Sequence, residues 1–227
     1  MNKSDQQIIW EFIRGDLHAS KFEKWIYDCS SFENLAENEF YLEVISTDFN
    51  DKSEIYLLKK KLEEFLRQKY PLSCECITVA DFDILDEGDE RWRHVRDSIF
   101  LVIVKNPDQP NWQLLLGKCK QCSQYWLIAE EFSINDIELL KRLDNAVADK
   151  IIQKNEWPEH FKTLEELLAI GKLNDRSVRF VDYVARGLIE AVQELKKDRP
   201  NITLAEIAFL LNIDEVRAQA LCKSSVS

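Results

Sequence analysis

The sequence is poor in glycine, histidine and methionine, and these shortages exclude several classes of site. Its five glycines lie far apart: Gly15, Gly88, Gly117, Gly171 and Gly187. No window therefore contains GxGxxG or GxxxxGK[ST], the loops that cradle phosphate groups. The three histidines, His18, His94 and His160, belong to no familiar nucleophile or metal motif, and GxSxG, HExxH and SxxK are absent. The sequence therefore predicts a protein that is not an enzyme.

Long hydrophobic runs are also missing. The longest apolar stretch, Ile99–Val104, is far shorter than the ~20 residues that a membrane-spanning helix needs. Residues 1–9 are too polar to contain the apolar core of a signal peptide. We therefore expect a cytoplasmic protein without a membrane partner. The six cysteines are then expected to be thiols or metal ligands rather than disulfides.

Basic residues are outnumbered, and the imbalance is local. The 227 residues include 30 lysines and arginines against 41 aspartates and glutamates, a net charge of −11. The balance is −5 over residues 1–75, −6 over 76–173 and zero over 174–227. An acidic surface repels nucleic acid, which makes that partner unlikely, and it attracts a basic protein. Since 45% of the residues are hydrophobic, the chain has ample material for a packed core.

The first 75 residues predict a helical module. Hydrophobic periodicity predicts helices over residues 5–15, 20–28 and 51–70. Gly15 is expected to end the first helix, Ser20 to cap the second, and Asp51 or Ser53 to cap the third. Residues 39–47 fit either a strand or a short buried helix.

The middle of the chain predicts an antiparallel sheet accompanied by helices. Strands are expected over residues 76–85, 99–104, 112–117 and 124–131. The β-branched run at 99–104 is typical of a central strand. A helix is predicted over 133–154, where Ser133 and Asp136 resemble a capping box. A short helix is expected to begin at Thr163 and to end near Gly171.

The last segment predicts helices over residues 176–197, 203–210 and 214–222. The final pair has helix-turn-helix spacing, with Asn212 suited to a positive φ in the turn. Asp214 and Glu215 begin the second helix of this pair and would repel phosphates, so a helical hairpin or protein contact is favoured over DNA reading. The expected fold is α+β and predominantly helical: an N-terminal helical module (1–75), a central antiparallel sheet with helices (76–173) and a C-terminal helical hairpin (174–227).

Two pairs of cysteines form the sharpest local signal. Cys119 and Cys122 form a CxxC between two predicted strands, an arrangement typical of a zinc knuckle, in which two thiolates from one turn bind the metal. Cys74 and Cys76 form the other close pair and are the expected remaining ligands, with His94 as a substitute. This predicts one structural zinc ion. The alternatives are ordinary reduced thiols or, less favoured because the motif lies within a hairpin, a thioredoxin-like redox motif.

A run of acidic residues is the candidate partner-binding segment. Six acids occur within ten residues and no base lies among them: Asp81, Asp83, Asp86, Glu87, Asp89 and Glu90. Mutual repulsion favours exposure of such a run, and the spacing of an EF-hand is missing. The run suits contact with a basic partner. It is equally consistent with a solvated loop whose charge the basic residues 91–96 neutralise.

Several segments resemble a family of bacterial proteins. They are WEFIRGDL at residues 10–17, FEKWIY at 22–27, FYLEVIS at 40–46 and GKCKQCSQYWLIAE at 117–130. Together they resemble proteins of which some look like immunity proteins of polymorphic or contact-dependent toxin systems. Ser123 stands where glycine is expected. The resemblance implies a cytosolic immunity protein that binds a cognate toxin, whereas composition implies only a basic partner. The two together suggest a basic, nuclease-type toxin. The alternative is a zinc-stabilised regulatory module whose C-terminal helices contact nucleic acid.

Overall fold

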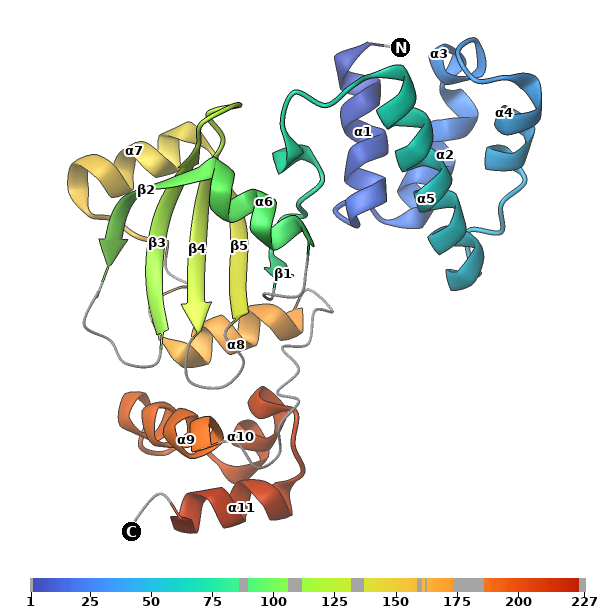
Figure 1. The fold of residues 1–227 in the computed structure, drawn as a ribbon. Coiled ribbons are helices and arrows are strands. Elements are labelled where there is room, and N and C mark those ends of the chain that lie inside the picture. Colours follow the sequence, from blue (N-terminus) through green and yellow to red (C-terminus); the bar gives the residue numbers. More distant parts are fainter. Residues whose placement is uncertain are drawn as a thin grey trace. The chain divides into compact units, whose positions relative to one another are not determined.

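The computed structural model of the chain divides into two compact units, Met1–Ala80 and Asp81–Ser227. We call them the N-terminal unit and the C-terminal unit. The structure describes residues 2–85, 90–105, 112–131, 137–158, 161, 163–173 and 186–224. The architecture is α+β and predominantly helical, as the sequence predicts, with one antiparallel sheet in the C-terminal unit (Figure 1).

The N-terminal unit is helical. Its helices are α1 (Lys3–Arg14), α2 (Ala19–Asp28), α3 (Ser30–Glu33), α4 (Asn38–Ile45) and α5 (Lys52–Lys69). Their apolar faces enclose one core, in which the rings of Phe12 and Phe22 stack with centroids 3.9 Å apart. Leu62 on α5 is fully buried in the same core. The unit thus has a hydrophobic core of its own, in which the first helix, α1, packs against the last, α5.

The ends of these helices test the predicted caps. Gly15 ends α1 with a φ of 89°, as expected for a glycine that stops a helix. Asp51 caps α5 by accepting hydrogen bonds from the amides of Ser53 and Glu54. The predicted cap at Ser20 is wrong, because the cap of α2 is His18, whose Nδ1 accepts from the Ser20 amide at 3.3 Å. The ambiguous segment 39–47 is the helix α4.

The segment after α5 does not form the strand predicted over residues 76–85. It contains a 3-10 turn, η1 (Glu75–Ile77), and a strand of only three residues, β1 (Asp83–Leu85). The side chain of Thr78 donates to the Glu75 carbonyl at 2.9 Å and closes the turn. The partial alternation of apolar and acidic residues was misleading because local hydrogen bonds of this kind compete with strand pairing.

The sheet of the C-terminal unit has five strands in the order β1-β5-β4-β3-β2, all antiparallel. After β1 they are β2 (Ile99–Lys105), β3 (Trp112–Cys119), β4 (Tyr125–Glu131) and β5 (Ile137–Leu143). The prediction that residues 99–104 form a central strand is wrong, because β2 lies at an edge and several of its apolar side chains are exposed. Its ladder with β3 shifts register between Leu101 and Ile103.

Helices cover both faces of the sheet (Figure 1). The α6 helix (Glu90–Ser98) lies on the face that carries Glu130 and Glu138. The other face carries Leu127 and shares a core with α7 (Asn145–Lys154), α8 (Leu164–Leu173), α9 (Arg186–Asp198), α10 (Leu204–Leu211) and α11 (Glu215–Ser224). The α6 helix was not predicted, because its run of charged residues leaves no clear apolar stripe.

The helix predicted over residues 133–154 is wrong in its first half. Residues 137–143 form β5, and α7 begins only at Asn145. Leu140 and Leu143 fit a helical stripe, but they are buried on opposite faces of the sheet. Ser133 and Asp136 lie outside the described residues. Gly171 does not end α8, which continues to Leu173, whereas Thr163 does cap it by accepting from the Glu166 amide at 3.2 Å.

The described residues that follow the predicted domain boundary near residue 174 do not form a core separate from that of the sheet. Leu188 and Leu195 of α9 are buried in one cluster with Trp112 and Leu127 of the sheet, so the C-terminal helices and the sheet form a single unit. Residues 174–185, which the predicted helix over 176–197 includes, lie outside the described residues.

The C-terminal helix pair forms as predicted. Asn212 ends α10 with a φ of 55°, and Ala208 is buried in the helical core. Thr203 and Glu206 form a capping box at the start of α10. Hydrogen bonds from Thr203 and then from Arg199 lower the pKa of Glu206 to about 2. Among the described residues, no helix is long and apolar enough to cross a membrane.

Gly117 allows β2 and β3 to approach closely. A Cβ at this position would lie 2.4 Å from Cγ2 of Ile99, a residue on the neighbouring strand. We therefore expect Gly117→Ala to lower the free energy of unfolding by about 1 to 3 kcal/mol, measured by chemical denaturation. Because Ile99→Ala removes the clashing atom, the double variant should lose less than the sum of the two single losses. Simple additivity would contradict this account.

Candidate metal centre

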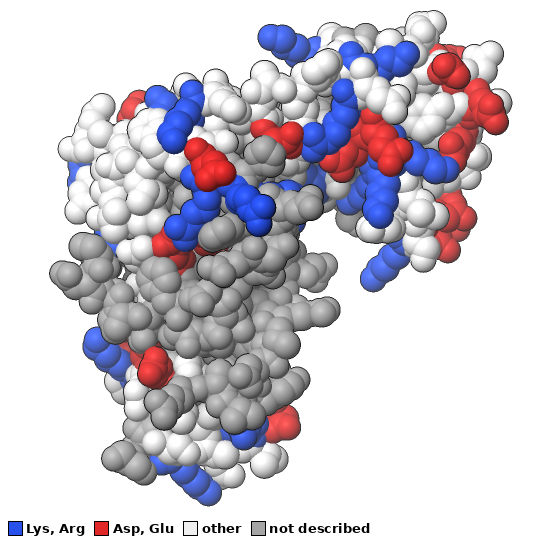
Figure 2. Space-filling view, viewed as in Figure 1, with Lys and Arg blue, Asp and Glu red and all other residues white. Residues whose placement is uncertain are grey.

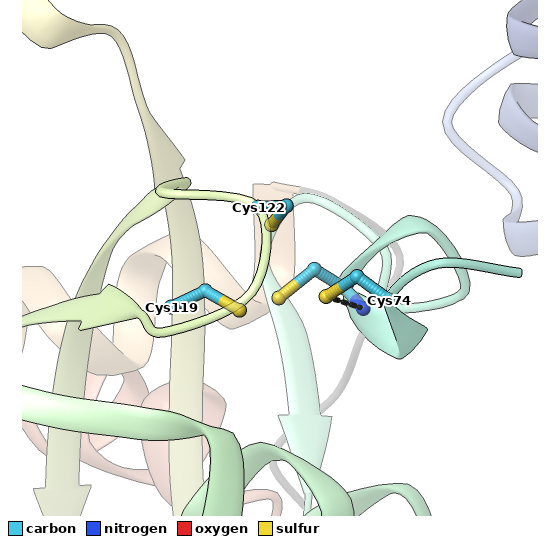
Figure 3. A group of neighbouring side chains, drawn as sticks. Cys74, Cys119 and Cys122 are labelled. Carbon is cyan, nitrogen blue, oxygen red and sulfur yellow. Dashed lines mark hydrogen bonds between the residues drawn. The ribbon is translucent and has the colours of Figure 1, made fainter.

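Four cysteines converge in the structure, and they are the four predicted from the sequence. The sulfur atoms of Cys74, Cys76, Cys119 and Cys122 all lie within 4.8 Å of one another. Figure 3 shows the Cys119 and Cys122 side chains on the turn between β3 and β4, near Cys74 of the segment after α5. These residues, which we call the four-cysteine cluster, could hold a metal ion.

The β3–β4 turn presents Cys119 and Cys122 in the manner of a knuckle. The amide of Cys119 donates to the Gln124 carbonyl at 2.9 Å, and the amide of Ser123 donates back to the Cys119 carbonyl at 3.0 Å. The Gln121 amide points at the Cys119 sulfur, 3.4 Å away. An N–H aimed at sulfur stabilises a thiolate more than a thiol, because the thiolate is charged. The turn is therefore built to present metal-binding sulfur.

Ser123 adopts the left-handed conformation that explains why glycine is expected there. Its φ is 63°, and the turn needs this value to reverse the chain directly after Cys122. A residue with a Cβ is strained in this region of φ/ψ space, whereas glycine is not.

Replacing Ser123 should therefore report on this strain. We expect Ser123→Gly to raise the free energy of unfolding by about 0.5 to 1 kcal/mol, measured by chemical denaturation. Ser46→Gly is the matched control, because Ser46 has a φ of −91° and donates to the Glu43 carbonyl. The control should lose stability. An equal response of both variants would rule out strain at Ser123.

The segment that carries Cys74 and Cys76 is held by an ion pair and by hydrogen bonds from helices α1 and α5 of the same unit. Glu75 lies between the two cysteines, and its carboxylate accepts hydrogen bonds from both terminal nitrogens of Arg67 on α5, each at 3.0 Å. This paired contact with Glu75 raises the pKa of Arg67 further above its usual value. Arg14 of α1 donates to the Ile77 carbonyl at 3.0 Å. The Cys76 amide donates to the Cys74 sulfur at 3.3 Å, so this pair also has a stabilising N–H···S contact (Figure 3).

The chemistry and spacing of the cluster fit one tetrahedral ion. Four thiolates bound at about 2.3 Å from zinc stand about 3.8 Å apart, close to the observed spacing of at most 4.8 Å. A cluster of several irons spreads its thiolates more widely, because they bind different irons. Soft thiolate ligands select zinc over magnesium or calcium. The two remaining cysteines, Cys29 and Cys222, are half-buried and belong to neither close pair.

Where the structure describes the predicted acidic run, its residues do not form an exposed docking loop. Asp83 is only 8% exposed and pairs with Arg91 at 2.9 Å. Asp81 accepts the Arg142 amide at 2.8 Å. The prediction that the run is exposed is therefore wrong for Asp83, because Arg91, which follows the run, neutralises the charge of this carboxylate within the chain. Three predicted residues lie outside the described residues: Asp86, Glu87 and Asp89. Glu90 begins α6, but neither its side chain nor that of the substitute ligand His94 is described.

A second acidic segment, which sequence reasoning did not single out, lies in the N-terminal unit. Residues 25–51 contain seven carboxylates and no lysine or arginine. All seven are exposed, and they are Asp28, Glu33, Glu37, Glu39, Glu43, Asp48 and Asp51. Figure 2 shows acidic side chains along the edge of this unit that α3 and α4 form. A charge balance summed over residues 1–75 did not reveal this segment, because over that range the lysines of α2 and α5 offset its negative charge.

A buried carboxylate pair is the other feature that the sequence did not reveal. Glu130 of β4 and Glu138 of β5 are register partners, 7% and 4% exposed. Arg96 of α6 reaches both, at 3.1 Å and 2.6 Å, and Gln113 donates to Glu130. Because carboxylates are common in this chain, the sequence alone did not indicate that these two are paired. The register between β4 and β5 shows it. The pair joins α6 to the sheet.

Comparisons with protein-family models, with curated proteins and with solved structures find no match for this chain. The function is therefore argued from the four-cysteine cluster and the surfaces of the molecule.

Proposed function

We propose that the chain is a zinc-stabilised protein without catalytic activity of its own, in which the four-cysteine cluster binds one structural zinc ion. The convergence of four sulfur atoms within 4.8 Å carries this proposal. Zinc sites with four cysteine ligands leave no open position for water or substrate, so they serve structure rather than catalysis. The N–H···S contacts at Cys74 and Cys119 support the thiolate form that the metal requires.

Metal analysis tests the zinc site directly. We expect the full chain, purified without chelators, to contain about one zinc per molecule by elemental mass spectrometry. Cobalt substituted for zinc should give the strong thiolate-to-metal charge-transfer absorption and the d–d bands of a tetrahedral thiolate site. Cys119→Ser should reduce the metal content to well below half, whereas the matched variant Cys222→Ser should retain it. A chain with no bound zinc in its reduced form contradicts the proposal.

We propose further that this zinc-stabilised protein acts in the cytoplasm as an immunity protein, binding a cognate toxin and blocking it by occlusion. The exposed acidic segment at residues 25–51 favours a basic protein partner, such as a nuclease-type toxin. Exposed Tyr27 and Leu42 lie within the same segment and add apolar contact area. Opposite charges accelerate association and make it sensitive to salt. A nucleic-acid contact through α11 is the alternative, which Asp214 and Glu215 oppose by charge.

Co-expression distinguishes these two proposals. Expression beside the toxin-like product of a neighbouring gene should protect cells and yield a complex of equal stoichiometry. Reversing two exposed carboxylates of the acidic segment, Glu33→Lys with Glu39→Lys, should slow association at low salt at least tenfold. Reversing the exposed Glu215 of α11 is the matched control and should leave the rate unchanged. Absence of both protection and complex formation sinks the immunity proposal, and salt-sensitive DNA binding would favour the alternative.

A further inference from the structure

The four ligands of the proposed zinc site differ sharply in their access to solvent. The side chains of Cys74, Cys76 and Cys119 are buried, with 9%, 5% and 1% of their surface exposed. Cys122, at the other end of the CxxC, is exposed. A reagent from solution therefore meets the sulfur of Cys122 before the sulfur of any other ligand.

An open cavity lies beside Cys122 in the C-terminal unit. Its volume is about 450 Å³, and its walls carry mainly polar groups, including Cys122, Ser123, Gln124 and Asn145. Lys118 and Asp149 also line it, so its walls carry one charge of each sign. A polar cavity of this size admits water and small water-soluble oxidants.

We propose that Cys122 is the site at which hydrogen peroxide oxidises the metal centre, and that a disulfide between Cys122 and Cys119 then releases the zinc. This inference rests on the proposed zinc site and assigns it a regulation. Thiolate character and exposure together determine which cysteines are oxidised. Zinc keeps all four sulfurs as thiolates, so exposure decides among them, and it selects Cys122.

The chemistry proceeds in two steps. The Cys122 thiolate attacks one oxygen of peroxide, an S–O bond forms, the O–O bond breaks, and the hydroxide that leaves takes a proton to become water. The Cys119 thiolate then attacks the oxidised sulfur, an S–S bond forms, the S–O bond breaks, and a second hydroxide leaves and is protonated. Two thiolates, one peroxide and two protons thus give one disulfide and two waters. The two electrons pass from sulfur to peroxide, and zinc does not change its oxidation state.

The fold favours Cys119 as the resolving partner. Both sulfurs belong to one short turn whose backbone is already closed by the hydrogen bonds between Cys119 and its neighbours Ser123 and Gln124. Loop closure therefore costs little entropy. After the disulfide forms, zinc retains only the sulfurs of Cys74 and Cys76. Two ligands hold zinc far more weakly than four, so the ion dissociates.

The experiment uses the full chain carrying Cys29→Ser and Cys222→Ser, so that the only thiols are those of the cluster. Zinc is quantified first, then peroxide is added and released zinc is followed with a chromogenic chelator. Disulfides are mapped by peptide mass spectrometry. We expect one zinc released per peroxide-derived disulfide, the bond to join Cys119 with Cys122, and the reductant dithiothreitol to restore binding.

Cys122→His supplies the decisive comparison, because histidine also binds zinc but cannot form the disulfide. In the same background it should retain zinc and release it at least tenfold more slowly under peroxide. Zinc that is bound but resists peroxide, or that leaves equally fast from Cys122→His, overturns this inference and leaves the structural zinc site standing. A reduced chain without zinc overturns both.

Discussion

Cys119→Ser should lower the thermal midpoint by roughly 6 to 12 °C, which corresponds to a loss of about 3 kcal/mol or more for a chain of this size. Zinc bound by four thiolates stabilises the folded state because the unfolded chain offers no preformed site. Cys119 is the most deeply buried of the four ligands, at 1% exposed, and its turn is fixed by backbone hydrogen bonds. A serine hydroxyl in its place is a poor ligand for zinc and leaves a buried polar group.

Calorimetry with and without zinc isolates the contribution of the metal. The midpoint of the original chain should fall on treatment with a strong zinc chelator and should recover when zinc is returned. The midpoint of Cys119→Ser should respond to neither treatment. Cys222→Ser, a half-buried cysteine on α11, controls for the loss of a thiol as such and should change stability by less than about 1 kcal/mol. Equal losses in the two variants would show that packing, and not metal, explains the effect.

Arg96→Met should destabilise the chain by about 3 kcal/mol at neutral pH. Glu130 and Glu138 lie side by side on adjacent strands, and their side chains are 9% and 5% exposed. The arginine of α6 reaches both carboxylates and compensates their charge. Without it, two carboxylates remain close together in a poorly hydrated site, a case in which removing one partner costs more than the pair itself contributes. Arg93→Met, on the exposed side of the same helix, is the matched control and should have little effect.

Removing one of the two charges identifies the cause of the loss. Repulsion between two close carboxylates disappears when only one of them can carry a charge, so adding Glu138→Gln to Arg96→Met should recover part of the lost free energy of unfolding at neutral pH. Chemical denaturation of the single and double variants measures this recovery. A deficit that Glu138→Gln does not reduce would attribute the effect to lost packing.

The sequence predicted the helical parts of this fold better than the strands of its sheet. Helices such as α5 and α10 carry a clear apolar stripe and a capping residue, so that local signals and tertiary packing agree. β5 was predicted as helix, because Leu140 and Leu143 match a helical period, and a strand buried on both faces carries apolar residues at such positions too. Only pairing with β4 distinguishes these interpretations, and pairing is a long-range property that spacing alone does not contain.

The four-cysteine cluster was the part of the site that could be predicted, because cysteine spacing carries information on ligand geometry directly. Cys119 and Cys122 were placed in a turn between strands, and the structure brings Cys74 and Cys76 to them. The acidic run at 81–90 shows the converse. Its charge is visible in the sequence, but the burial of Asp83 and its pairing with Arg91 depend on β1, the short part of the predicted strand 76–85 that forms, and on α6, which was not predicted.

The division of the chain into two units sets an order of events during synthesis. The first 80 residues contain a complete core of helices joined by short connections, and domains generally fold as units, the N-terminal one first, during synthesis. Cys74 and Cys76 are therefore made, and their segment anchored by Arg67, before the ribosome has added Cys119 and Cys122. For that interval the nascent chain carries half of a ligand set. Completion of the four-cysteine cluster then marks the point at which the β3–β4 turn has emerged and closed.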